Sequence, residues 1–191
     1  MGLKIPHVTH ADTLSAQQPN ILKILGIDPG LVHLGFGLIE VCGRSIIHVC
    51  HGTLHTRRDK RLSTTADTLA RVRILSVLLN KILDQHRPQH AALEAFSYRG
   101  PHVTSTLQIS TVIGMVGELL TSRSIEWKEY ATAHIKATIG PSARSTKHQI
   151  SNYVARLLNL HELPSSEHAS DALAIAITHA RHLQCKQIIP S

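Results

Sequence analysis

The chain has 191 residues, of which 42% are hydrophobic and 3% aromatic, and its formal net charge at pH 7 is +7. This length is enough for one well-filled core and short for two. The excess of 20 Lys and Arg over 13 acids favours a polyanionic partner, while the scarcity of aromatic residues argues against a broad stacking platform for single strands. We expect one domain over residues 21–183, a flexible extension over residues 1–20 and a C-terminal tail over residues 184–191.

The cysteines and the hydropathy pattern indicate a cytoplasmic protein. Cys42, Cys50 and Cys185 include no C-x-x-C pair, so neither a disulfide framework nor a cysteine zinc site is indicated. No apolar run approaches the roughly 18 to 20 residues of a membrane span, and the N-terminal segment lacks the apolar core of a signal peptide.

The first third of the chain predicts three successive strands, separated by turns that contain Gly30 and Gly43. The strands are expected at residues 23–28, 34–41 and 46–55. Consecutive strands joined by short turns form an antiparallel meander.

The middle of the chain alternates between helical and strand patterns. A helix with apolar residues at helical spacing is expected at residues 62–86 and ends before Pro88. A strand, a helix and another strand follow, at residues 91–96, 104–120 and 125–130. This alternation adds a parallel section to the sheet.

Three further helices complete the chain, at residues 131–138, 146–160 and 167–182. The hydroxyls of Ser145 and Ser166 are suited to cap the second and third of these helices. The expected fold class is α/β, with a mixed sheet of five strands, of which the first three are antiparallel, flanked by helices.

Three carboxylates occur at the ends of core elements. Asp28 closes an apolar run, Glu94 ends a second one, and Asp171 opens the apolar part of the last helix. A buried unpaired carboxylate costs several kcal/mol, so a metal ion is the expected partner. Mg²⁺ and Mn²⁺ prefer oxygen ligands, and two such ions can activate a water and stabilise the leaving oxygen of a phosphodiester.

Three motifs in this order resemble the RuvC family of Holliday junction resolvases: Ile24-Leu25-Gly26-Ile27-Asp28-Pro29-Gly30, Leu93-Glu94-Ala95-Phe96, and the run from His168 to His179. The resemblance covers residues 23–182. It implies a ribonuclease H-like fold and a homodimer that nicks two strands of like polarity at a four-way DNA junction, leaving 5′-phosphate ends. It also implies partnership with the RuvA and RuvB branch-migration proteins.

The resemblance also implies roles for single residues. His168 stands where the family usually has a fourth carboxylate, and imidazole can ligate Mn²⁺ or act on the attacking water. Lys136 and Lys147 stand where the family has basic residues used on DNA, and Arg144 is a further candidate. The expected site is therefore Asp28, Glu94, His168 and Asp171 with two Mg²⁺ ions, Mn²⁺ being the alternative.

The family often presents an aromatic residue three positions after its glutamate, which wedges into the opened junction. That spacing gives Ser97 here, with Phe96 and Tyr98 on either side. Tyr98 is the preferred candidate, since Phe96 also suits the core.

Three other functions are compatible with parts of the sequence. The carboxylates alone permit a ribonuclease acting on RNA–DNA hybrids. The first motif resembles that of sugar kinases and actin-like ATPases, but 191 residues leave no room for their second lobe. A junction-binding module without catalysis is the third alternative, and His168 is its only support. The histidine pairs elsewhere are interpreted as surface or core residues.

Overall fold

The computed structural model describes residues 21–96 and 103–188. The sheet order is β3-β2-β1-β4-β5, with β1 antiparallel to β2 and parallel to β4, and β4 parallel to β5. Both the antiparallel meander and the parallel section are therefore confirmed. The strands are β1 (Ile21–Asp28), β2 (His33–Cys42), β3 (Ser45–His55), β4 (His90–Glu94) and β5 (Glu126–Tyr130).

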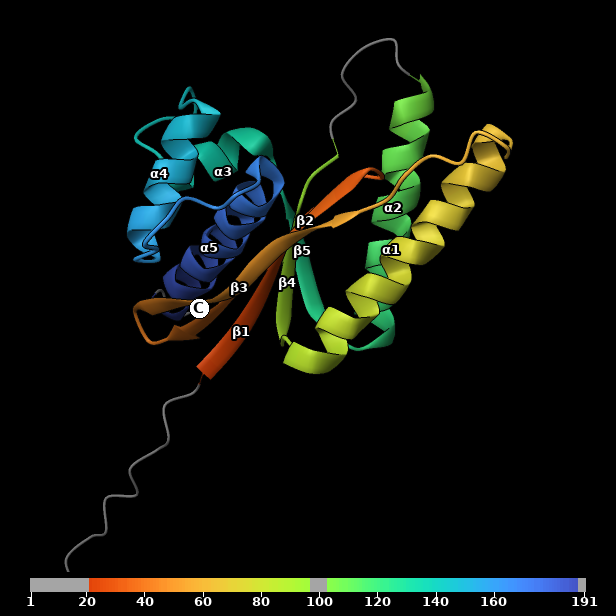
Figure 1. Cartoon of the computed structure of the whole chain (residues 1–191). Coiled ribbons are helices and arrows are strands. Elements are labelled where there is room, and N and C mark those ends of the chain that lie inside the picture. The colour runs from red at the N-terminus through yellow and green to blue at the C-terminus, as the bar shows by residue number, and fades with distance from the viewer. Residues whose placement is uncertain (1–20, 97–102, 189–191) are drawn as a thin grey trace, which may run out of the picture.

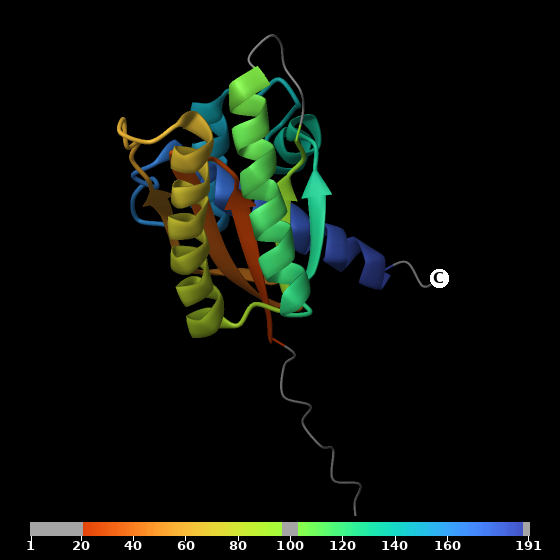
Figure 2. The same ribbon diagram turned by 90° about the vertical axis from the view of Figure 1, so that its right-hand side faces the viewer.

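Helices cover both faces of the sheet. Two pack on one face and three on the other (Figures 1 and 2). The helices are α1 (Thr64–His86) and α2 (Val103–Ser122) on the first face, and α3 (Thr132–Ile139), α4 (Lys147–Leu157) and α5 (Glu167–Ile188) on the second. The alternation of side chains along β1 sends Ile24 into the core under α5 and Leu25 into the core under α1 and α2.

The end of α5 and the N-cap of α4 differ from the sequence-based expectation. The last helix continues to Ile188, so residues 184–188 are helical and do not form a tail. The N-cap of α4 is Thr146, because its hydroxyl accepts a hydrogen bond from the backbone of Gln149 and the Gln149 side chain accepts one in return from the backbone of Thr146. Ser145 instead donates its hydroxyl to the carbonyl of Ser142. The expected extension over residues 1–20 lies outside the described residues.

Glycines allow α5 to lie directly against the backbone of the sheet. A Cβ atom on Gly26 of β1 would collide with the carbonyl oxygen of Ala172, and one on Gly35 of β2 would collide with the carbonyl oxygen of His168. Gly26 and Gly35 thus set the depth at which α5 packs. This contact is what carries the first turns of α5 to the end of β1.

Within the described ranges, none of the helices combines the length and the apolar character required to cross a membrane.

We predict that Gly26→Ala lowers the free energy of unfolding by about 1–3 kcal/mol or more, because the new methyl group meets backbone atoms that cannot rotate away. Urea denaturation of both proteins measures this change. The control is Gly43→Asn, since a Cβ there meets nothing within 4 Å and Asn tolerates the left-handed φ of 57°. Equal losses in the two variants would contradict the proposed close contact.

Candidate active site

The three carboxylates predicted from the sequence line one cavity of about 420 Å³. Asp28 and Glu94 end the neighbouring parallel strands β1 and β4, in which Ile27 pairs with Leu93. Parallel strands bring their carboxyl ends to the same edge of a sheet, and α5 adds Asp171 from its first turns. Residues far apart in the sequence therefore meet at one edge.

Asp28 contacts the imidazole of His168. Asp28 Oδ2 and His168 Nδ1 are 2.7 Å apart, and the side chains are 16% and 39% exposed respectively. The ring of His168 also stacks on His33, with ring centroids 5.3 Å apart and the rings inclined by 22°. His168 is thus held by a carboxylate and a second histidine.

Asp171 contacts Lys147 of α4. Lys147 Nζ lies 3.6 Å from Asp171 Oδ2 and 3.2 Å from Glu167 Oε2. Burial, together with the nearby charges of Asp28 and Glu94, raises the pKa of Asp171 to about 6, although Lys147 acts in the opposite direction. The cavity therefore carries negative charge that Lys147 neutralises only in part.

Glu94 accepts a hydrogen bond from the hydroxyl of Thr132, the first residue of α3. Neither Thr132 nor His33 was predicted from the sequence. Thr132 contacts Glu94 because α3 begins directly after β5, and His33 reaches His168 because β2 begins beside the end of β1. A single threonine and one histidine among fifteen carry no signal in the sequence that would distinguish them.

The donor set fits a divalent cation such as Mg²⁺ or Mn²⁺. Carboxylate oxygens are the ligands these ions prefer. Burial, and to a smaller extent the charges of Asp28 and Glu94, raise the pKa of Asp171, and a bound cation would offset both effects. In the described part of the chain, however, no three His, Cys, Asp or Glu side chains are arranged as a ready metal site. Asp28, Glu94 and Asp171 instead contact His168, Thr132 and Lys147.

The DNA-binding candidates have different positions. Lys136 and Lys147 line the cavity. Arg144 is exposed, and its backbone N–H donates to Ser142 Oγ, but it does not line the cavity. Phe96 is 40% exposed, so it is not a core residue. Ser97 and Tyr98 lie outside the described residues.

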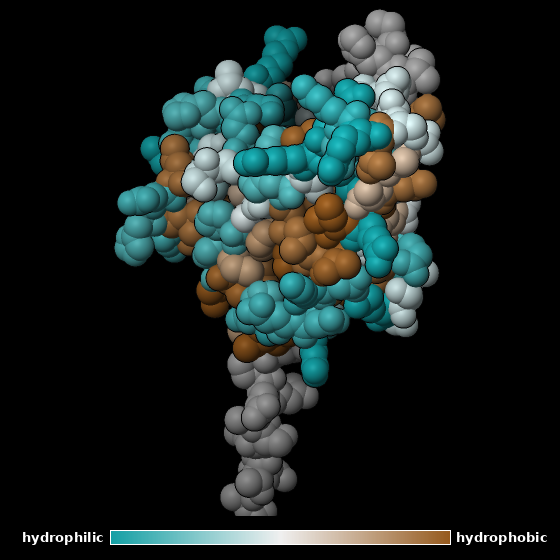
Figure 3. Space-filling model, turned by 45° about the vertical axis from the view of Figure 1, so that its right-hand side comes forward, coloured by the Kyte–Doolittle hydropathy of each residue, from teal (hydrophilic) through white to brown (hydrophobic). Residues whose placement is uncertain are grey.

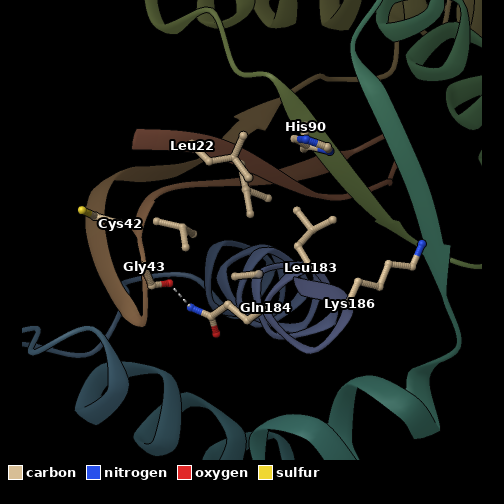
Figure 4. A pocket seen from close by; sticks show the side chains of 10 residues that line it. Leu22, Cys42, Gly43, His90, Leu183, Gln184 and Lys186 are labelled. Carbon is tan, nitrogen blue, oxygen red and sulfur yellow. Dashed lines mark hydrogen bonds between the residues drawn. The ribbon is translucent and has the colours of Figure 1, made fainter. Parts of the chain in front are cut away.

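A larger cavity, of about 690 Å³, lies at the opposite end of β1 (Figure 4). Leu22 and Leu183 contribute apolar surface to it, and Gln184 donates a hydrogen bond to the carbonyl of Gly43 at 2.9 Å. None of the described residues that line it is an acid. The smaller cavity, with its carboxylates, is therefore the candidate catalytic centre.

His179, one of the histidines interpreted as surface or core residues, lies in the core. It is 4% exposed, and its Nδ1 lies 2.8 Å from the Tyr130 hydroxyl. Burial lowers the pKa of His179 to about 4, so it is neutral at pH 7.

The five-stranded mixed sheet, with carboxylates at the ends of β1 and β4 and on the last helix, defines a ribonuclease H-like nuclease. The family model for "Crossover junction endodeoxyribonuclease RuvC" matches residues 24–179. The chain therefore belongs to the RuvC family.

Relatives and solved structures agree with this membership. The chain is 33% identical to the crossover junction endodeoxyribonuclease RuvC of Treponema pallidum, over 91% of this chain and 85% of the relative. The RuvC of Thermotoga petrophila is 34% identical, over 87% and 97% of the two chains. The structure of T. thermophilus RuvC in complex with Holliday junction substrate superposes with a TM-score of 0.75 and 25% identity, covering 86% of this chain and 96% of that one.

We predict that Asp171→Asn stabilises the metal-free protein at pH 7 by about 1–3 kcal/mol. The pKa of Asp171 in the folded protein, about 6, lies above its ordinary value of 3.8, so folding favours the protonated acid. Asp171 therefore makes its whole contribution to the free energy of unfolding below pH 4, and this contribution is lost as the pH rises through 6. Urea denaturation of both proteins in EDTA at pH 4 and pH 7 measures the difference in their free energies of unfolding. A stabilisation by Asp171→Asn at pH 4 as large as that at pH 7 would contradict the prediction.

Proposed function

We propose that this protein resolves four-way DNA junctions in recombination and repair by making symmetric nicks in two strands of like polarity. The observation that carries the proposal is the convergence of Asp28, Glu94 and Asp171 on one cavity, inside the span that matches the RuvC family. The T. thermophilus relative, solved with a Holliday junction substrate, supports this choice of substrate.

Asp28, Glu94 and Asp171, with His168, are the proposed holders of two Mg²⁺ ions, or of Mn²⁺. When bound, such ions activate a water and stabilise the leaving 3′ oxygen of a phosphodiester, which leaves 5′-phosphate and 3′-hydroxyl ends. Asp28 would hold a cation together with Glu94, which ends the neighbouring strand, and His168 of α5, which contacts it.

The remaining residues of the cavity position these groups. Thr132 holds Glu94 through its hydroxyl, which fixes one carboxylate oxygen. Lys147 holds Asp171 and, with Lys136, provides positive charge for the scissile phosphate. Arg144, exposed beyond the cavity, is proposed to contact DNA further from the scissile bond.

The segment after β4 is the proposed wedge into the opened junction. Phe96 is exposed just beyond Glu94, which favours it as a stacking residue more than the sequence alone did. Tyr98 remains the second candidate.

We propose a homodimer, because a two-fold symmetric junction requires two equivalent active sites. The outer helices α1 and α2 expose apolar side chains suited to a contact between two copies: Leu69, Ile74, Val77 and Leu107. Apolar surface bordered by hydrophilic side chains is visible in the middle of Figure 3. Exposed apolar patches of this kind mark interaction sites.

Two further proposals follow from family membership. RuvA and RuvB branch-migration proteins are the proposed partners, since a resolvase acts on a junction that these motors move. The cytoplasm, where bacterial DNA recombines, is the proposed location.

We predict that Asp28→Asn abolishes cleavage of a synthetic four-way junction in Mg²⁺ but leaves the Kd for the junction within about threefold of the wild-type value, since phosphate contacts dominate affinity. Gel-shift and nicking assays on the same junction measure both quantities.

Linear duplex and an RNA–DNA hybrid are the control substrates. Nicking at a normal rate by the variant would refute the role of Asp28, and wild-type hydrolysis confined to the hybrid would support a ribonuclease instead. Tight junction binding without cleavage by the wild type in either metal would favour a binding module.

We also predict that His168→Asp lowers the ratio of the cleavage rate in Mn²⁺ to that in Mg²⁺ by roughly tenfold, because Mg²⁺ accepts imidazole less readily than Mn²⁺ does. Single-turnover rates in each metal measure the ratio, with His168→Ala as the control that removes the ligand altogether. An unchanged ratio in His168→Asp would show that His168 is not a metal ligand.

A further inference from the structure

A basic segment connects β3 to α1. Residues 57–61, here called the basic loop, read Arg57, Arg58, Asp59, Lys60 and Arg61. A run of charge in a loop is ordinarily only a solvated surface. The contacts that the two residues before this loop make with the start of β2 and the turn before it indicate a more specific role.

The basic loop begins beside the residues that follow Asp28. The backbone N–H of Thr56 donates to the carbonyl of Val32 at 3.0 Å, and its hydroxyl donates to the carbonyl of Leu31. The preceding residue, His55, has its Nδ1 2.8 Å from Nδ1 of His33, whose ring stacks on His168. Direct contacts from His55 through His33 to His168 therefore link the residues just before the loop to the candidate site.

A buried ion pair holds the loop in place. Arg71 and Asp67 of α1 have side chains only 7% and 4% exposed, with Nη1 and Oδ2 3.3 Å apart. Arg71 Nε also donates to the Thr56 hydroxyl at 2.8 Å, and Asp67 Oδ1 accepts the backbone N–H of Asp59 at 2.7 Å. Burying an ion pair is costly and adds little stability by itself. What this pair provides is a fixed conformation for residues 56–59.

Most of the cations of the loop are available for a partner. Arg61 is occupied by Asp59, at 2.8 Å. Arg57, Arg58 and Lys60 are exposed, and none of them forms an ion pair within residues 21–96 and 103–188. Three cations on an ordered loop suit the regularly spaced phosphates of a nucleic acid backbone better than a flexible acidic peptide.

We infer that the basic loop binds backbone phosphates of the DNA, through Arg57, Arg58 and Lys60. This inference rests on the proposed function and adds a second DNA-binding surface, on the other side of the sheet from Lys136 and Lys147. Lys136 and Lys147 approach the cavity from α3 and α4, whereas the basic loop leads into α1 on the other side of the sheet (Figure 1). A DNA strand that passes over the carboxylates would then be held on both sides of its scissile bond.

The test is the salt dependence of junction binding by the triple variant Arg57→Ala, Arg58→Ala, Lys60→Ala. We expect the Kd at 100 mM salt to rise roughly 10- to 100-fold, and the slope of log Kd against log salt concentration to fall by about two to three, one for each phosphate that the variant no longer neutralises. The matched control removes three exposed cations from the far end of the molecule: Arg44→Ala, Lys81→Ala and Lys186→Ala. This control is expected to change the slope by less than about one.

A second pair of variants separates charge from conformation. Thr56→Val keeps every cation but removes the hydroxyl that contacts Leu31 and Arg71. It is expected to weaken junction binding less than the triple variant does, and Thr56→Ser, which keeps the hydroxyl, is expected to restore wild-type affinity. Equal affinities of Thr56→Val and the wild type would show that the anchored conformation is not needed.

The outcomes distinguish this inference from the proposed function. The inference alone would be overturned if the triple variant bound the junction with the same Kd and the same salt dependence as the wild-type protein, while the wild-type protein still cleaved the junction. A wild-type protein that neither bound nor cleaved the junction would overturn the proposed function first.

Discussion

The close packing of α5 on the backbone of β1 and β2 is the constraint on which the candidate active site depends. The absence of side chains at Gly26 and Gly35 brings the carbonyl oxygens of Ala172 and His168 against the strands. Asp171 and His168 then reach the edge at which Asp28 and Glu94 end their strands. An extra methyl group at either glycine would displace the helix that carries half of the site. Precise phosphoryl chemistry depends on this kind of rigid support.

The charges in the cavity explain why its carboxylates contact other side chains of the protein when no cation is bound. Burial disfavours the charged form of Asp171, and the neighbouring carboxylates Asp28 and Glu94 add repulsion, so the pKa of Asp171 is raised. Lys147 and His168 contact two of these carboxylates, and Thr132 donates to the third. A divalent cation would take over part of this role. The basic character of the rest of the chain, with a net charge of +7, then favours the approach of a polyanion to an acidic centre.

The sheet was predictable from the sequence because apolar periodicity and turn residues specify strands and helices locally. Asp28, Glu94 and Asp171 were recognisable because each ends or opens a buried element. The contact of His168 with His33, and of Glu94 with Thr132, depends on how distant elements pack, which no local pattern encodes. The length of α5 was underestimated because residues 184–188 lack the apolar pattern that marks its earlier turns.

The most direct test is a crystal structure of the wild-type protein soaked in Mn²⁺, in which the metal is located by its anomalous scattering. Anomalous peaks are expected in the cavity among Asp28, Glu94 and Asp171, with the Lys147 side chain withdrawn from Asp171. Anomalous density only elsewhere on the molecule, with these three carboxylates still engaged by protein groups, would contradict the claim that they form a metal-dependent catalytic centre.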